Sequence, residues 1–93
     1  MPYELNLPRL LKRAGWKVKI RDKERLEPPH VTILLGMKAW RLDLRTREFL
    51  DRGDSWSQID DGVRNAIETN WKTLQHEWDQ RYPENPIGED DDD

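Results

Sequence analysis

Hydrophobic and polar residues alternate in two segments of the first half of the chain. Residues 16–21 read Trp-Lys-Val-Lys-Ile-Arg, and residues 40–44 read Trp-Arg-Leu-Asp-Leu. A period of two places the apolar side chains on one face of a strand and the charged ones on the other. Residues 30–35, His-Val-Thr-Ile-Leu-Leu, form a more apolar run between them. The pattern therefore predicts three β-strands, each with one buried face.

The apolar pattern of the last two strands restricts the length of the loop between them. A two-residue turn at Gly36-Met37 pairs Ile33 with Trp40 and keeps the apolar sets on one face. Glycine at the first position suits a type II′ turn. A four-residue loop also preserves the faces, whereas a three-residue loop without a bulge does not. The sequence therefore predicts an even loop.

Two shorter elements flank these strands. Residues 7–15 have Pro8 at a first helical position and Gly15 at a C-terminal stop, which predicts a short helix. After the third strand, Thr46-Arg47 can turn the chain and place Phe49 opposite Leu44. This arrangement predicts a short fourth strand.

The second half carries a helical stripe of apolar residues. Successive members are separated by four, four, four, three, four and four positions, which is the spacing of one helix face. Pro83 stops the pattern. We expect a single helix over residues 59–81. The stripe consists of Ile59, Val63, Ile67, Trp71, Leu74, Trp78 and Tyr82.

These elements predict an α+β fold. A three- to four-stranded antiparallel meander packs on one long C-terminal amphipathic helix, preceded by a short N-terminal helix, because neither layer is stable alone. We expect one domain over residues 1–83. Residues 84–93 end in Glu-Asp-Asp-Asp-Asp. They have little to bury, which predicts a disordered acidic tail.

Composition narrows the class of protein. Charged residues make up 38% of the chain, yet its five tryptophans argue for a folded core. There is no cysteine, which excludes disulfides and thiolate metal sites. The first residues do not resemble a signal peptide, and the longest apolar run, residues 33–37, is too short to span a membrane. We expect a cytoplasmic protein without a membrane segment.

Charge is distributed unevenly along the chain. Residues 1–58 hold 13 basic and 8 acidic residues, whereas residues 59–93 hold 3 and 11. Strand alternation collects cations on the sheet face away from the helix. That face either follows a phosphate backbone or is an ordinary solvated surface. The acidic tail either competes for it in cis or only improves solubility. The cations are Lys17, Lys19, Arg21, Arg41 and Arg45, with Arg47 at the turn.

No catalytic, metal or cofactor motif is apparent. His30 and His76 are 46 positions apart, unlike zinc-binding pairs, and neither has a nearby Ser or Cys partner in sequence. His30 is the candidate for a general base or a phosphate contact, because imidazole titrates near neutral pH. Its alternative role is that of a polar residue at the start of a strand. We expect no cofactor and no bound metal.

One string resembles a known family. Residues 27–31, Glu-Pro-Pro-His-Val, are similar to the Glu-Pro-Pro-His-Val-His motif that leads into a strand in a family of short bacterial proteins, domain of unknown function number 4160. The likeness continues through residues 39–44 and covers most of residues 14–87. The family's second histidine is Thr32 here. Chemistry by a pair of histidines is therefore not expected in this chain.

The later part of the resemblance includes Leu74 and Trp78 near the end of a helix, followed by the Pro/Ile segment 83–87. Members of the family are often encoded beside small regulatory proteins, in arrangements like toxin–antitoxin pairs. The resemblance therefore implies a small protein partner.

Three functional hypotheses follow. The first is a non-enzymatic binding module that pairs with another small protein in a toxin–antitoxin-like or regulatory pair. The second is an RNA- or DNA-binding protein, or a ribonuclease-type toxin, which uses the basic sheet face on phosphates and His30 in any chemistry. The third is a structural or adaptor domain. The sequence leaves the oligomeric state open.

Overall fold

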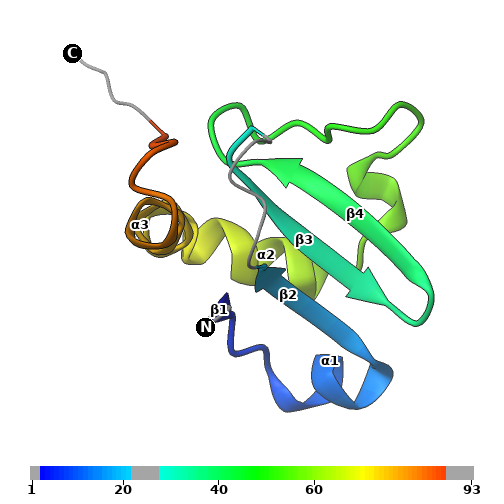
Figure 1. The fold of residues 1–93 in the computed structure, drawn as a ribbon. Coiled ribbons are helices and arrows are strands. Elements are labelled where there is room, and N and C mark those ends of the chain that lie inside the picture. Colours follow the sequence, from blue (N-terminus) through cyan, green and yellow to red (C-terminus); the bar gives the residue numbers. More distant parts are fainter. Residues whose placement is uncertain (1–2, 22–27, 88–93) are drawn as a thin grey trace.

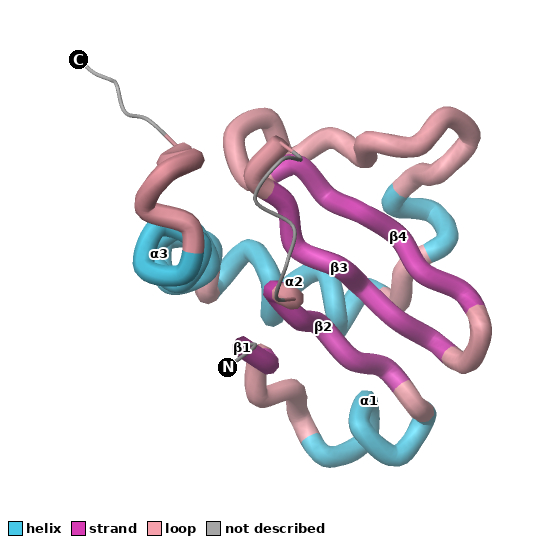
Figure 2. Tube along the Cα trace, in the orientation of Figure 1, coloured by secondary structure: helices cyan, strands magenta, loops and turns pink. Residues whose placement is uncertain are grey.

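The computed structural model of the chain describes residues 3–21 and 28–87. Of the acidic tail expected at residues 84–93, residues 88–93 lie outside these ranges, whereas residues 84–87 are described. A four-stranded antiparallel sheet, in the order β1-β2-β3-β4, packs with three α-helices and one 3₁₀ turn (Figures 1 and 2). The α+β class is therefore confirmed. The elements are β1 (Tyr3–Glu4), α1 (Arg9–Ala14), β2 (Trp16–Ile20), β3 (His30–Leu35), β4 (Lys38–Asp43), η1 (Trp56–Gln58), α2 (Asp61–Thr69) and α3 (Trp71–Arg81).

The β3–β4 connection has the length expected from the apolar pattern. Leu35 pairs with Lys38, and Ile33 pairs with Trp40. Gly36 has φ 59°, and Met37 has no positive φ. This combination fits a type II′ turn, which favours glycine at its first position. The two-residue turn is confirmed, and with it the face that Trp40 occupies.

The fourth strand of the sheet is not the one that the pattern predicts. It is β1, whose Tyr3 pairs with Ile20 on the outer side of β2. Phe49 forms only an isolated bridge, and its partner is Leu42 rather than Leu44. The difference arises at the turn after β4, which reverses the chain earlier than predicted. The carbonyl of Asp43 accepts from the amide of Arg47 at 3.0 Å, the amide of Asp43 donates to the carbonyl of Glu48 at 2.8 Å, and Arg47 has φ 66°.

The short N-terminal helix is confirmed as α1. Pro8 occupies the N-cap, and Gly15 ends the helix in the left-handed region with φ 102°. Glycine tolerates that conformation because it has no Cβ. A Cβ built at Gly15 would lie 3.5 Å from a methyl group of Leu35. The end of α1 is thus close to the end of β3.

The predicted single helix over residues 59–81 is wrong. The segment contains two helices, α2 and α3, which meet at Asn70 with φ −105° and ψ 21°. The amide side chain of Asn70 donates to the carbonyl of Ala66 at 2.8 Å. In Figure 1, α2 lies behind the sheet, whereas α3 is seen nearly end-on beside the ends of the strands.

The apolar stripe itself is confirmed, since all seven of its residues are buried. Its first spacings are all four residues, and each step of four turns about 40° too far around a helix of 3.6 residues per turn. The step of three from Trp71 to Leu74 turns the stripe back by about 60°, so that the residues from Val63 to Tyr82 stay within about 100° of one another. The break at Asn70 lets α2 cover the sheet and α3 cover its end.

The core lies between the helices and the sheet face that carries Val18, Val31 and Ile33. Residues 83–87 follow α3 and pack against it, beyond the expected domain boundary at Pro83. The indole N–H of Trp78 donates to the carbonyl of Asn85 at 2.8 Å, and Ile87 packs against the core. We call residues 83–87 the C-terminal strap.

Candidate functional site

The first candidate site is the sheet face opposite the core, which we call the outer face. Its central row consists of Lys19, Thr32 and Arg41, which are paired across β2, β3 and β4. Lys17 lies on the same face, two residues before Lys19 in β2. The expected separation of the strand cations from the buried tryptophans is therefore correct.

The charges of this row are balanced by carboxylates at both ends. Glu4 of β1 pairs with Lys19, and their side chains approach to 4.0 Å. At the other end, Arg41 donates two hydrogen bonds to Asp51, of 3.0 Å from Nε and 2.6 Å from Nη2. The hydrogen bond and charge of Arg41, together with the charge of His30, hold the pKa of Asp51 below its ordinary value against a smaller effect of burial. Two of the expected phosphate-binding cations are thus engaged within the molecule.

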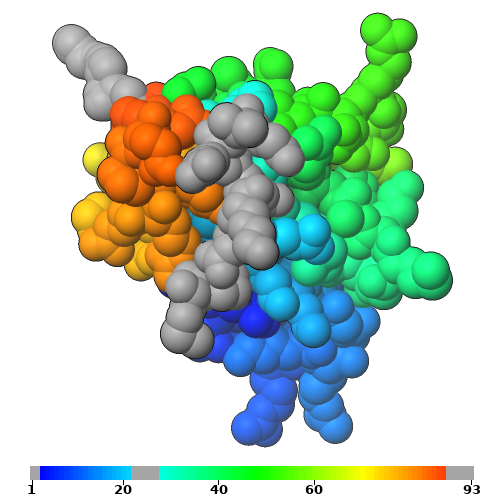
Figure 3. All heavy atoms as spheres, viewed as in Figure 1, coloured from blue at the N-terminus to red at the C-terminus, as the bar shows by residue number. Residues whose placement is uncertain are grey.

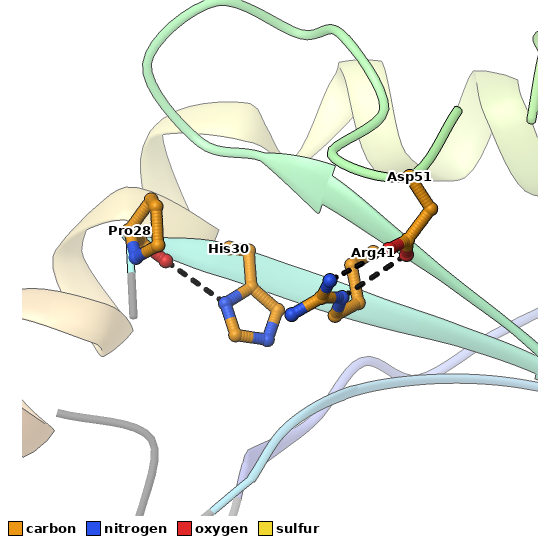
Figure 4. Close-up of polar contacts among 4 residues, drawn as sticks. All are labelled: Pro28, His30, Arg41 and Asp51. Carbon is orange, nitrogen blue, oxygen red and sulfur yellow. Dashed lines mark hydrogen bonds and ion pairs between the residues drawn. The ribbon is translucent and has the colours of Figure 1, made fainter. Parts of the chain in front are cut away.

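His30 lies beside Arg41, and both side chains project from the same side of the sheet (Figure 4). The imidazole is fully buried. Its Nδ1 lies 2.9 Å from the carbonyl of Pro28, so Nδ1 carries a hydrogen and donates it. The ring centroid is 5.7 Å from that of Trp78. This geometry closes the turn before β3 and fills space against α3, which is a structural role.

Thr32 is the other buried polar residue of the outer face, with 2% of its surface exposed. Its hydroxyl oxygen has no hydrogen-bond partner in the part of the chain that the structure describes. The hydroxyl lies between Lys19 and Arg41 in the row. Since the carboxylates of Glu4 and Asp51 neutralise those cations, the row as a whole does not favour an anion.

The other three predicted cations lie outside the central row. Arg21 is exposed at the end of β2, and its carbonyl accepts a hydrogen bond from the hydroxyl of Tyr82. Arg45 donates to the carbonyls of Pro86 and Ile87 in the C-terminal strap. Arg47 stacks over Trp71, 4.8 Å from the ring centroid. The structure therefore disperses the seven predicted residues and brings together Lys17, Lys19, His30 and Arg41.

A second charged surface was not predicted. It lies at the end of the sheet where β2 begins and where β3 joins β4, next to α1. In Figure 3, side chains of the blue segment that contains α1 project from the lower edge of the molecule. We call this surface the hairpin end. It carries the exposed cations Arg9, Lys12, Arg13, Lys17 and Lys38 and the exposed apolar residues Leu10 and Met37.

The five cations of the hairpin end form no ion pair with a described residue. A carboxylate nearby is Glu4, which lines a shallow pocket of about 320 Å³ together with Lys12. Leu10 is 77% exposed and Met37 is fully exposed. The run Arg-Leu-Leu-Lys-Arg at residues 9–13 was the sequence signal for this surface, although only the fold adds Lys17 and Lys38 to it.

The hairpin end adjoins an open strand edge. β4 is the last strand of the sheet, and residues 48–50 lie along the second half of its outer edge, with a bridge between Phe49 and Leu42. In an antiparallel pair, every second residue exchanges backbone hydrogen bonds with its partner strand, and the residues between them direct their N–H and C=O groups away from it. Beside the two-residue turn, Lys38 and Trp40 belong to the first set, so the backbone groups of Ala39 and Arg41 point away from β3. The Arg41 carbonyl accepts from Leu50 at 2.9 Å, so Ala39 marks the open part of the edge.

Comparisons with known proteins found no match among family models, curated proteins or solved structures. Within the described residues, no helix is long and apolar enough to cross a membrane.

Proposed function

We propose that this chain is a non-enzymatic binding module that pairs with another small protein through the hairpin end. The observation that carries the proposal is the group of five exposed cations without ion pairs around Leu10 and Met37. Lys38 lies over the Trp40 ring, 5.6 Å from its centroid, but none of the five forms an ion pair with a described residue. Cations without such ion pairs attract an acidic surface and increase the rate of encounter. The partner is therefore an acidic protein.

The two apolar residues favour a protein over a nucleic acid as the partner. Leu10 and Met37 are the exposed large hydrophobic residues of the described chain, and both lie at this end. Aliphatic side chains supply the dry centre of a protein interface, whereas single-stranded nucleic acids need aromatic platforms for their bases. The aromatic residues nearest the turn, Trp16 and Trp40, stack on each other in the core.

The open edge at Ala39 supports a particular mode of binding. An extended segment of a partner can add to the edge of a sheet through main-chain hydrogen bonds. Segment 48–50 already lies along the second half of β4, which limits such an addition to the part of the edge near Lys38. The added segment would thus lie directly beside the cations of the hairpin end.

The resemblance of residues 27–31 to domain of unknown function number 4160 supports the same class of function. The resemblance implies that the partner is a small protein of a toxin–antitoxin-like or regulatory pair. A cytoplasmic location and a bacterial source belong to this proposal as well.

Affinity capture at native expression tests the proposal. We expect the wild-type chain to retain one stoichiometric acidic protein after nuclease treatment, identified by mass spectrometry. A Lys12→Glu/Lys17→Glu variant should lose this protein, because the charge reversal lies at the hairpin end. The matched control is Arg52→Glu/Lys72→Glu, which makes the same change of charge at exposed positions elsewhere.

The control should retain the partner, and the two variants should unfold at similar denaturant concentrations. Equal loss in both variants would indicate a non-specific charge effect. Absence of any stoichiometric protein would contradict the proposal directly.

Nucleic-acid binding on the outer face is the alternative function. Lys17 and Arg21 favour it, since both are exposed and neither has an ion pair among the described residues. Binding through phosphates would weaken steeply between low and moderate salt. A Lys17→Glu/Lys19→Glu variant should then lose RNA or DNA binding. A flat salt response in a filter-binding measurement would exclude this function.

A further inference from the structure

The C-terminal strap ends at a defined place on the surface. Arg45 donates to the carbonyls of Pro86 at 2.9 Å and Ile87 at 2.7 Å, and the amide of Ile87 donates to Asp79 at 2.9 Å. Ile87 also packs on the core. These contacts hold the end of the strap just past the last residue of β4. This is the end of the sheet at which β3 begins, because His30 pairs with Asp43. Residues 88–93 start from this fixed point.

The segment that follows is complementary in charge to the hairpin end. Residues 88–93 read Gly-Glu-Asp-Asp-Asp-Asp and carry five carboxylates. The hairpin end carries five cations that have no ion pair among the described residues. Opposite charges at this density attract over about 10 Å at moderate salt. The segment therefore has the chemistry that the proposed function assigns to the partner.

We propose that residues 88–93 of a second copy of this chain bind at the hairpin end and compete there with the acidic partner. The inference rests on the surface named in the proposed function and adds its regulation. The contact joins the tail of one molecule to the opposite end of the next. Such a contact is head-to-tail, so it produces chains rather than closed dimers unless the geometry closes a ring.

Geometry favours a second copy over the molecule's own tail. Six residues span at most about 20 Å when fully extended. β4 alone covers about 17 Å from Lys38 to Asp43, and the strap is held beyond the far end of that strand. A molecule would have to stretch its own tail completely to reach α1. A tail from another molecule meets no such limit.

The tail's carboxylates compete with other acids on the same cations, so the contact depends on concentration and salt. Each exposed charge pair is weak, and only the set of five produces measurable association. At low protein concentration the hairpin end is open to the partner. At high concentration it is occupied by tails.

Amide chemical shifts of the ¹⁵N-labelled full-length chain test the inference. Diluting the protein from about 1 mM to about 0.05 mM at about 20 mM ionic strength should shift the amides of residues 9–13, 17 and 37–39. The shifts should disappear in a full-length variant with Glu89→Gln and with Asp→Asn at positions 90–93. The control variant Glu48→Gln/Glu84→Gln should behave as the wild type, because both carboxylates lie outside residues 88–93.

A mixing experiment separates contact in trans from contact in cis. Unlabelled wild-type chain, added to the labelled tail-neutral variant, should shift the hairpin-end amides of the labelled molecule, and about 200 mM salt should reduce this effect about tenfold. Shifts that are the same at every concentration, with no effect of mixing, would show that the tail folds back on its own molecule. That result, or no shift at all, would overturn the inference.

The two proposals fail separately. If the tail-neutral variant captures the acidic partner as the wild type does and no mixing shift is seen, the tail contact is wrong and the proposed function remains. If the mixing shifts occur but Lys12→Glu/Lys17→Glu still captures the partner, the partner binds elsewhere. Stronger capture by the tail-neutral variant than by the wild type at high concentration supports both.

Discussion

Arg45 donates a hydrogen bond of 2.7 Å from Nε to the main-chain carbonyl of Ile87, which is 42 residues later in the chain. The contact joins the turn after β4 to the end of the C-terminal strap. A side chain that the charge pattern assigns to a phosphate-binding face therefore holds the protein's own backbone. Nη2 of the same guanidinium donates a second hydrogen bond, of 2.9 Å, to the carbonyl of Pro86.

We predict that Arg45→Gln releases the strap. Two hydrogen bonds from a charged donor at an exposed site are together expected to contribute about 1–2 kcal/mol. The strap should open locally before the core unfolds. Hydrogen exchange of the Ile87 amide, which donates to Asp79, measures this opening. Arg52→Gln is the control, since Arg52 is exposed, and unchanged exchange in Arg45→Gln would contradict the prediction.

The pair Arg41–Asp51 predicts a dependence of stability on pH. The hydrogen bond and charge of Arg41 lower the pKa of Asp51 from its ordinary value of 3.8. A carboxyl group with a lowered pKa in the folded state stabilises the protein above its ordinary pKa, and this contribution is lost as the pH falls through the folded value. The wild type should therefore lose more stability below about pH 4 than Asp51→Asn does.

The size of this pH effect is limited by solvent. The side chains of Arg41 and Asp51 are 39% and 43% exposed, so the difference between wild type and Asp51→Asn should not exceed about 1 kcal/mol. Urea unfolding at intervals from neutral pH to about pH 3 measures it. Parallel curves for the two proteins over this range would show that the pair does not couple to folding.

His30 should behave as a core residue. It is fully buried, its Nδ1 donates to Pro28, and its ring packs near Trp78. His30→Ala removes a hydrogen bond and leaves a cavity, and we expect a loss of about 2–4 kcal/mol. His76→Ala is the matched control on the exposed side of α3, with an expected change within about 0.5 kcal/mol. A similar small change at His30 would refute the structural role.

The β3–β4 turn offers a prediction with a control in the adjacent position. Gly36 has φ 59° and open space where a Cβ would be, so only backbone strain opposes a larger residue. Gly36→Ala should cost about 1–2 kcal/mol. Met37→Ala, at a fully exposed position without positive φ, should change stability by less than about 0.5 kcal/mol. Thermal unfolding of both variants measures these changes in stability, and equal changes in the two would contradict the prediction.

Local periodicity in the sequence was sufficient for the faces of the three long strands and for the register of β3 with β4. Trp16, Val18 and Ile20 are buried because a period of two leaves one face for the core. The even spacing of apolar residues about Gly36 determined which residues pair across the turn. The stripe from Ile59 to Tyr82 determined which side of the helical segment is buried.

Two features depended on contacts between distant parts of the chain. β1 has two residues and carries no pattern of its own, and it becomes a strand only because β2 offers an unpaired edge. The helix breaks at Asn70, between α2 behind the sheet and α3 beside the ends of the strands. These features follow from packing, which no local window of sequence contains.

The features of the candidate site also divide into those that the sequence determined and those that only the tertiary structure decided. The sequence alone determined that Lys17, Lys19 and Arg41 share the face opposite the core, because alternation is a property of the backbone. Only the tertiary structure decided which of these charges are neutralised, since Glu4 and Asp51 reach them from segments outside the three strands. For the same reason, only the fold collects α1, Lys17 and Lys38 at the hairpin end. Charge pairing depends on distance in space, whereas the sequence reports only distance along the chain.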